Sequence, residues 1–345
     1  MYYELLPDSV KSAKKIILLD GGYFVFRMTK HWSPKGKMRQ AHNRLKRGKI
    51  NWFQRQAAFK KAINNDVAYV GFRLGEMKLN PKYESDCRVI VCWDGIHGRR
   101  NRGNLDSQYK ANRHGAEETY SAAEHEGVDI REKLSSMGLE PNNLSKGWHG
   151  LYDAGLEGDD LMAHLAFEAI EKEKEVIILS SDSDMVQMLA QPLRLHDFTK
   201  EITAIDVYEK YGVLPRQYAD WKALVGDVSD NIVGVPFIGP VAAKKLISEW
   251  DNLDSIPAES ITTIKPKYDI SRRLNGLRKK EGYSLSYAKK KFGSAWERME
   301  KGDVNEFSWS AAHKILNLIG DEHFETISYR ERLNCSRKLI EIPFK

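Results

Sequence analysis

Acidic residues are concentrated in one short stretch of the chain, at positions where a helix and a strand would begin or end. The five carboxylates belong to Glu157, Asp159, Asp160, Asp182 and Asp184. No lysine or arginine stands beside any of them, so their mutual repulsion is costly unless a cation lies among them. Acids in a first helical turn also interact with the helix dipole, which accounts for one or two of the five. The remaining acids predict a cation site.

Three continuously apolar runs predict strands that are covered on both faces. They are residues 16–19, 89–93 and 176–179. A continuous rather than alternating pattern is typical of parallel strands between two layers of helices. Apolar residues with helical spacing, from Leu161 to Ile170, precede the third run, so helix and strand alternate. We therefore predict an α/β fold with a mostly parallel central sheet flanked by helices.

The first two runs end in the same dipeptide, Asp-Gly, at Asp20 and Asp94. An isolated Asp-Gly after a strand is usually only a turn. In a doubly wound sheet, however, the loops at the carboxyl ends of parallel strands form the ligand crevice. Asp20 and Asp94 are therefore predicted to face the acidic stretch, although they lie far from it in the sequence.

Basic residues are concentrated elsewhere. The net charge is only +6, yet residues 21–65 contain twelve Lys and Arg and no Asp or Glu. Trp32, Trp52 and Phe53 are interleaved with these cations, as in surfaces that bind phosphates and stack on bases. A solvated basic helical hairpin explains the same residues equally well. An acidic cluster with separate basic tracts indicates a metal site and a polyanionic partner.

Cysteine content and hydropathy limit the class of protein. Cys87, Cys92 and Cys335 lack Cys-x-x-Cys spacing, so neither a disulfide framework nor a zinc knuckle is expected. The early apolar run 16–19 is too short for a signal peptide, and no apolar stretch is long enough to cross a bilayer. These features favour a soluble cytoplasmic protein that does not associate with membranes.

The segment between the second strand and the acidic stretch is rich in Gly, Arg, Asn and Glu. On a helix, Tyr109, Lys110 and Arg113 would lie within one turn and share a face. Such a Lys/Arg pair usually lies on a solvated helix face. It indicates a functional role only together with the acidic residues around it. A further charged helix is expected at 117–137, where it would cover the crevice.

The second half of the chain contains a glycine hairpin. Asp227 and Asp230 lead into Gly234 to Gly239, which we predict to connect two helices. Backbone N–H groups at such a helix start can face a phosphate oxygen. Residues 252–301 are basic and predicted to be helical, which extends the positive surface of the hairpin. Residues 337–343 are predicted to form a short strand or an extended tail.

In this order, the motifs resemble those of the flap endonuclease and 5′→3′ exonuclease superfamily, particularly its phage ribonuclease H-type members that remove RNA primers. The resemblance rests on Leu19-Asp20-Gly21, Trp93-Asp94-Gly95, Tyr109-Lys110-Ala111-Asn112-Arg113, Glu157-Gly158-Asp159-Asp160, Ser181-Asp182-Ser183-Asp184, Gly226-Asp227-Val228-Ser229-Asp230-Asn231 and the glycine hairpin. It covers most of the chain. The sequence departs from the family pattern at Gly158, where many members carry alanine, and in the long basic insert between Asp20 and Asp94.

The resemblance implies metal-assisted hydrolysis of phosphodiesters that leaves a 5′-phosphate, with two Mg²⁺ or Mn²⁺ ions. One ion would be held by Asp20, Asp94, Glu157 and Asp159, and the second would lie near Asp160, Asp182, Asp184, Asp227 and Asp230. Carboxylate and water oxygens are the ligands that these hard cations prefer. Lys110 and Arg113 would contact the scissile phosphate from an arch, and Tyr109 would stack on a base.

The resemblance also implies how the chain is divided and what it binds. A catalytic domain would span 1–225, with a helical arch at about 96–150, followed by a helix-hairpin-helix domain at 226–325. The tail 326–345 would return to the catalytic domain. Duplex DNA would be held by Gly234, Val235, Gly239, Lys244 and Lys245, with a monovalent cation such as K⁺ on the hairpin carbonyls. The substrates would be DNA or RNA/DNA hybrids with a 5′ flap or nick.

A monomer acting in replication or repair is the expected form, in the host cytoplasm if a phage encodes it. A single-strand-binding protein and a sliding clamp are the protein partners compatible with that role. Two other functions remain open. A PIN-type ribonuclease would share strand-end carboxylates but would need neither the arch nor the hairpin. A non-catalytic, structure-specific DNA-binding protein would not need the complete set of acids.

Overall fold

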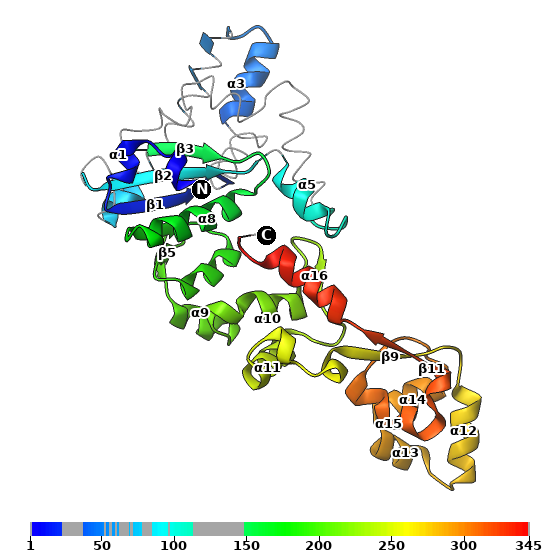
Figure 1. Cartoon of the computed structure of the whole chain (residues 1–345). Helices are drawn as coiled ribbons and strands as arrows, with labels where there is room; N and C mark the ends of the chain where they lie inside the picture. Colours follow the sequence, from blue (N-terminus) through cyan, green and yellow to red (C-terminus); the bar gives the residue numbers. More distant parts are fainter. Residues whose placement is uncertain are drawn as a thin grey trace. The chain divides into compact units, whose positions relative to one another are not determined.

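The computed structural model describes residues 2–22, 37–51, 53–54, 57–58, 61, 69, 72–77, 85–95, 97–112 and 148–343 (Figure 1). The chain forms two compact units. The first contains Met1–Tyr218, Ser229–Asn231 and Leu339–Lys345, and the second contains Ala219–Val228 and Ile232–Lys338. In the described ranges, no helix combines the length and the apolar composition needed to cross a membrane.

A six-stranded sheet forms the centre of the first unit. Its strand order is β3 (Trp148–Tyr152), β2 (Cys87–Trp93), β1 (Lys15–Asp20), β4 (Glu175–Leu179), β5 (Arg194–His196) and β6 (Glu201–Ile202). Neighbouring strands are parallel except β5 and β6, which pair antiparallel. The predicted α/β fold with a mostly parallel sheet is confirmed.

The three apolar runs form the central strands because both of their faces are covered. Ile17, Leu18 and Leu19 of β1 are fully buried. The helix α8 (Gly158–Glu171) packs on the sheet through buried residues that include Leu161 and Leu165, which have the predicted helical spacing (Figure 1). Burial of each such side chain contributes roughly 1.5–3 kcal/mol, so this helix and the central strands anchor the unit.

Strand register brings the ends of β1, β2 and β4 to one edge of the sheet. Asp20 pairs with Cys92, which places Asp94 just beyond the end of β2. Leu19 pairs with Leu179, so the residues after β4 emerge beside Asp20. This edge carries the carboxyl ends of the parallel strands, where ligands bind in open α/β sheets.

Further helices of the first unit surround the sheet or extend from it. They are η1 (Tyr3–Leu5), α1 (Asp8–Lys11), α3 (Lys37–Lys46), α5 (Gly98–Gly103), η3 (Ser183–Ala190), α9 (Ala204–Tyr211) and η4 (Pro215–Gln217). The basic segment is helical at α3, as predicted, and Arg44, Lys46 and Arg47 are exposed. Trp32 and Trp52 lie outside the described residues, and Phe53 is exposed.

The second unit begins with two helices around a tight hairpin. These are α10 (Tyr218–Val225), the short strands β7 (Gly226–Asp227) and β8 (Ile232–Val233), and α11 (Pro240–Trp250). The antiparallel strands β9 (Thr262–Pro266), β10 (Phe307–Ser308) and β11 (Phe324–Ser328) follow, with β9 in the middle. The remaining elements are η5 (Leu253–Ser255), η6 (Ala258–Ile261), α12 (Ser271–Lys280), α13 (Leu285–Phe292), α14 (Ser294–Glu300), α15 (Trp309–Ile319), η7 (Asp321–His323) and α16 (Arg330–Ile340).

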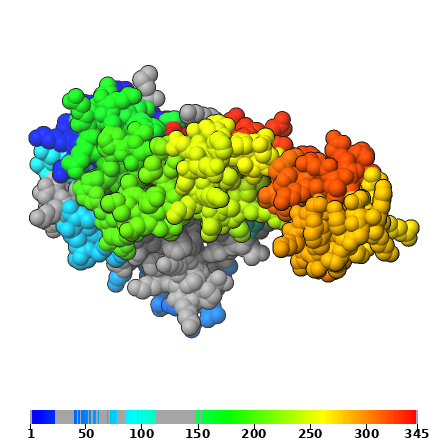
Figure 2. Space-filling view, turned by 90° about the horizontal axis from the view of Figure 1, so that it is seen from below, coloured from blue at the N-terminus to red at the C-terminus, as the bar shows by residue number. Residues whose placement is uncertain are grey.

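Helices α12 to α15 share a separate core. Trp296 is fully buried, and Leu274, Ile315 and Phe307 pack in the same cluster. Figure 2 shows the outer surface of these helices in orange, next to the yellow residues of α11. The core explains why a strongly basic segment folds: its cations stay outside while one stripe of each helix is apolar.

Three sequence-based predictions of secondary structure were wrong or incomplete. β3 was missed, because Trp148-His149-Gly150-Leu151-Tyr152 has no continuous apolar run. Residues 252–301 are not helical throughout, since they include β9. The predicted strand or tail at 337–343 instead contains the end of α16, whose Leu333, Leu339 and Ile340 are buried on one side.

Candidate metal and phosphodiester site

The side chains at the carboxyl edge of the sheet are linked by hydrogen bonds. Ser180 Oγ, just after β4, donates to Asp20 Oδ2 at 3.0 Å, and it accepts from the Asp182 N–H at 3.0 Å. Asp20 Oδ1 also accepts from the Gly22 N–H at 2.7 Å. The serine therefore fixes the Asp20 carboxylate relative to the segment that carries Asp182.

Asp20 has a perturbed acidity. Burial raises its pKa to about 7, with further upward contributions from the negative charges of Asp94 and Asp182, while the bonds from Ser180 and Gly22 act in the opposite direction. The surrounding protein groups alone therefore stabilise the ionised form of Asp20 poorly. A cation among these acids would favour its ionised form.

The start of α8 contacts Asp94, the residue that follows β2, at the same edge of the sheet. The Gly158 N–H, in the first turn of α8, donates to Asp94 Oδ1 at 2.7 Å. Gly95 has no space for a side chain, because a Cβ there would lie 1.9 Å from the Asp153 carbonyl oxygen. The glycine after Asp94 is therefore required by the close passage of the chain that leads into α8.

Glu157, the N-cap residue of α8, is buried and accepts bonds from two residues of the segment 107–112. Lys110 Nζ lies 2.9 Å from Oε1 and 2.8 Å from Oε2, and the Tyr109 hydroxyl donates to Oε2 at 3.1 Å. Next to it, burial raises the pKa of Asp159, although Arg102 and Lys110 act in the opposite direction. Lys110 is thus in reach of the acidic edge, as its predicted role requires.

The segment that carries Lys110 does not have the predicted conformation. Residues 107–112 form consecutive turns, and Lys110 has a φ of 54°, so the expected helix face is absent there. Tyr109 is 4% exposed, which leaves no ring surface for a base in this arrangement. Arg113 and the predicted charged helix at 117–137 lie outside the described residues.

Arg102, on α5, was not identified from the sequence. It is 3% exposed, and its Nη2 donates to Asp160 Oδ1 at 2.6 Å and lies 3.6 Å from Asp159 Oδ1. Nη1 donates to the Leu339 carbonyl at 2.6 Å. Asp160 is therefore held in a buried ion pair with Arg102. Asp94 and Asp182, in contrast, are exposed.

Two other predicted acids meet at a distance that suits a metal. Oxygens of Asp184 and Asp230 lie within 4.8 Å of each other in the first unit. The Tyr218 hydroxyl donates to Asp184 Oδ1 at 3.3 Å. Asp227 belongs to the second unit, where Lys222 Nζ lies 2.5 Å from its Oδ2.

Hydrogen bonds also connect the Lys110 segment to the Asp230 motif. The Lys110 N–H donates to the Asp230 carbonyl at 2.7 Å, and Asn231 Nδ2 donates to the Gln108 carbonyl at 2.7 Å. These contacts give the segment a fixed path although it has no regular secondary structure.

The donor set fits hard divalent cations. All candidate ligands are carboxylates, and no cysteine or histidine stands among them, which favours Mg²⁺ or Mn²⁺ over zinc. Burial and, after it, the negative charges of Asp94 and Asp182 raise the pKa of Asp20, so its ionised form lacks a counter-charge. A divalent cation would supply that counter-charge.

The hairpin of the second unit is built around two glycines. Gly226 has a φ of +85°, and Gly234 lies so close to the end of α10 that a Cβ would meet the Val225 carbonyl at 2.4 Å. The Val235 N–H donates to the Leu224 carbonyl at 2.9 Å. Gly239 then caps α11, on which Lys244 and Lys245 are exposed.

We expect Gly234→Ala to destabilise the second unit by about 1–3 kcal/mol, because the backbone of α10 has to move away from the new methyl group. Gly276→Ala is the matched control. Gly276 lies within α12 with no atom near its ideal Cβ, so this change should stabilise by about 0.5–1 kcal/mol. Urea denaturation measures both changes. Equal effects of the two substitutions would contradict the steric argument.

Comparison with known proteins identifies the family. The family model described as 5′-3′ exonuclease, N-terminal resolvase-like domain, matches residues 15–212, and the one described as 5′-3′ exonuclease, C-terminal SAM fold, matches residues 213–287. The chain belongs to the 5′-3′ exonuclease family, a family of nucleases. The resemblance inferred from the seven motifs is therefore confirmed.

Similarity to curated proteins supports the same family assignment. The chain is 28% identical over 217 residues to the 5′-3′ exonuclease of Buchnera aphidicola subsp. Schizaphis graminum, which covers 61% of this chain and 70% of the relative. It is 42% identical over 113 residues to the thermostable DNA polymerase I of Thermus aquaticus. That match covers 32% of this chain and 14% of the polymerase.

A solved structure of the phage T5 5′-exonuclease with bound divalent zinc has the same fold. It aligns with a TM-score of 0.53 and 20% identity, over 95% of this chain and 90% of the exonuclease. A complex of the T5 D15 flap endonuclease with DNA and metal ions aligns with a TM-score of 0.50 and 18% identity, over 94% and 99% of the two chains.

Proposed function

We propose that this protein is a divalent-metal-dependent 5′→3′ exonuclease and structure-specific flap endonuclease. It would hydrolyse phosphodiesters near the 5′ ends of DNA flaps and RNA/DNA primer hybrids, in primer removal during DNA replication or in repair. The observation that carries the proposal is the convergence of Asp20, Asp94 and Asp182 at one sheet edge, next to Glu157 and Lys110, in a member of this family.

Two Mg²⁺ or Mn²⁺ ions would occupy the acidic edge. The first would be held by Asp20, Asp94, Glu157 and Asp159, and the second by Asp182, Asp184 and Asp230, with Asp227 completing the set and Asp160 supporting it from behind. When bound, such ions lower the pKa of a coordinated water and neutralise phosphate charge. Asp20 would give up its proton on binding, and Ser180 would keep its carboxylate aimed at the edge.

Lys110 would act on the substrate phosphate. Its ammonium now neutralises Glu157, and it can turn toward an anion once a metal takes over that carboxylate. A cation aimed at a phosphate stabilises the charge that develops in the transition state. Arg113 would contribute a second positive charge from the same segment.

Lys110→Ala should lower the turnover number by about 10²–10³-fold, as the loss of one transition-state contact does. Binding of a duplex should change little, because the wider basic surface remains. Single-turnover cleavage of a 5′-labelled flap with Mg²⁺ measures the effect. Lys172→Ala removes an exposed lysine at the end of α8 and serves as the control. A wild-type rate for Lys110→Ala would remove this residue from the mechanism.

The second unit would hold the duplex independently of its sequence. Gly234, Val235 and Gly239 would present backbone groups to a phosphate, with Lys244 and Lys245 beside them and K⁺ on the hairpin carbonyls. Exposed cations of α12 and α13, such as Lys279, Lys280 and Lys290, would extend this positive surface. Specificity would then come from the structure of the substrate: a 5′ end, flap or nick.

We further propose that the protein acts as a monomer in the cytoplasm, which is the host cytoplasm if a phage encodes it. All three cysteines are free thiols, which suits a reducing compartment. A single-strand-binding protein or a sliding clamp would be its replication partner.

One assay tests the activity. The protein is incubated with Mg²⁺ and a 5′-labelled RNA/DNA hybrid, a flap or a nicked duplex, and we expect short labelled products that EDTA suppresses. The relative rates on the three substrates rank the primer and flap functions. Binding without cleavage in either Mg²⁺ or Mn²⁺ would instead support a non-catalytic DNA-binding protein.

A further inference from the structure

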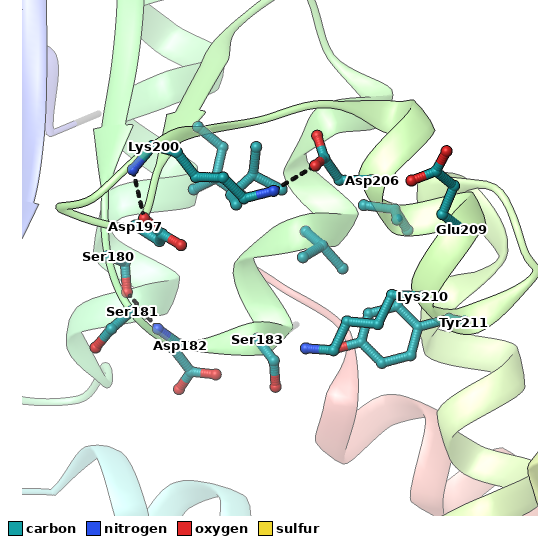
Figure 3. Close-up of a pocket in the computed structure, with 14 residues that line it drawn as sticks. Ser180, Ser181, Asp182, Ser183, Asp197, Lys200, Asp206, Glu209, Lys210 and Tyr211 are labelled. Atoms are coloured by element: carbon teal, nitrogen blue, oxygen red, sulfur yellow. Dashed lines mark hydrogen bonds and ion pairs between the residues drawn. The ribbon is translucent and has the colours of Figure 1, made fainter.

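An open pocket of about 480 Å³ lies next to the acidic edge, within the first unit (Figure 3). Its polar lining includes Ser181, Asp182, Ser183, Lys200, Lys210 and Tyr211. The serines and Asp182 come from the segment after β4, and Lys210 and Tyr211 come from α9. The volume falls in the range of small-molecule sites, roughly 300–1,000 Å³.

The pocket adjoins the candidate metal site through Asp182. The Asp182 N–H donates to Ser180 Oγ, which in turn donates to Asp20. Ser180 and Asp182 both line the pocket. A molecule bound there would therefore lie beside Asp182, which is one of the carboxylates proposed to hold metal.

The two lysines of the pocket differ in their partners. Lys200 Nζ lies 2.5 Å from Asp206 Oδ1. Lys210 Nζ lies over the Tyr211 ring, 4.8 Å from its centroid, and no carboxylate of the described residues pairs with it. Figure 3 shows the Lys210 side chain directed toward the Ser183 side of the pocket. Lys210 thus offers a positive charge that no carboxylate in the described part of the chain neutralises.

The acids around the pocket are mostly occupied. Asp206 also accepts from the Thr203 N–H and hydroxyl, and its pKa is lowered by Lys200 and by these bonds. Asp197 accepts from the Thr199 N–H and hydroxyl and from the Lys200 N–H. Glu209 is the remaining carboxylate of the lining besides Asp182. An anion near Lys210 would therefore face one unengaged acid, Glu209, once Asp182 binds metal.

We propose that this pocket binds the phosphate of a single nucleotide next to the scissile position, with Lys210 as its cationic ligand and the exposed Ser181 hydroxyl as a donor. Ammonium and hydroxyl groups are common phosphate ligands. The inference rests on the proposed nuclease function. The nucleotide is either the released 5′-monophosphate or one residue of the displaced 5′ strand, which share this chemistry.

The test measures binding with Ca²⁺ in place of Mg²⁺, so that a hard cation is available to Asp182 while the metal proposed for catalysis is absent. Thymidine 5′-monophosphate and a single-stranded deoxythymidine decamer are each titrated into wild-type protein, Lys210→Met and Lys200→Met. Methionine keeps an aliphatic stem on the Tyr211 ring and removes the charge. We expect Lys210→Met to weaken binding about tenfold, as the loss of one charge-assisted phosphate contact does, and Lys200→Met to have little effect.

For the decamer, the slope of log Kobs against log salt should also fall by about 0.7 in Lys210→Met. Lys210→Arg should restore both quantities. Weakening with the monophosphate identifies a product site, and weakening with the decamer alone identifies the displaced strand. Equal losses in the two methionine variants, or none in Lys210→Met, would overturn the proposal. A failed cleavage assay with intact Lys210-dependent binding would instead overturn the nuclease function alone.

Discussion

Asp182→Asn should lower the cleavage rate by about 10²–10³-fold or more, while substrate binding stays intact. The change removes one negative charge from the proposed metal site and keeps the size of the side chain. Asp182 is exposed, and its Oδ1 accepts from the Asp184 N–H at 2.8 Å, a bond that the asparagine Oδ1 can retain. The fold should therefore survive, so the loss would report on chemistry.

Single-turnover cleavage of a 5′-labelled flap in Mg²⁺ gives the rate, and binding of the same flap in EDTA gives Kd. Asp86→Asn is the matched control, because Asp86 is an exposed aspartate at the opposite end of β2. It should cleave as the wild type does. A wild-type rate in Asp182→Asn would exclude this residue as a metal ligand, and loss of binding in EDTA would point to misfolding.

Arg102→Met should destabilise the first unit by about 3–5 kcal/mol, because it removes the guanidinium that neutralises the buried Asp160 carboxylate. Both side chains are almost fully buried, and the 2.6 Å bond between them replaces the water that each has lost. The guanidinium also holds the Leu339 carbonyl, so part of the loss would come from the end of α16.

Urea denaturation measures this change, and Arg100→Met supplies the control. Arg100 lies on the same short helix and is exposed, so its replacement should alter stability little. The double variant Arg102→Met/Asp160→Leu should recover much of the loss, because apolar pairs often replace buried ion pairs without cost. A stable single variant, or a double variant no better than it, would contradict the assignment.

The sequence predicted the parts of the site that depend on strand periodicity. Continuous apolar runs identified β1, β2 and β4, and parallel pairing then required Asp20, Asp94 and Asp182 to meet at one edge. Only the geometry of a parallel sheet was needed, so distance along the chain did not matter. The family resemblance supplied the division of the acids between two ions, which remains a proposal.

Features that depend on a single tertiary contact could not be predicted in this way. Arg102 is one of several arginines in a polar segment, and only packing shows that it is buried against Asp160. The Lys110 segment has helical composition, yet its bonds to Asp230 and Glu157 impose turns. Residues 337–343 were predicted to form a strand or a tail, whereas the buried Leu333 and Ile340 are seven residues apart and share one side of α16.

The backbone carbonyl and the side-chain carboxylate of Asp230 make different contacts. Its carbonyl oxygen accepts from the Lys110 N–H, while its carboxylate lies near that of Asp184. A side-chain substitution leaves the carbonyl in place, so the path of the Lys110 segment and the local negative charge can be varied independently. Asp230→Asn would therefore lower the negative charge near Asp184 and keep the carbonyl that accepts from the Lys110 N–H.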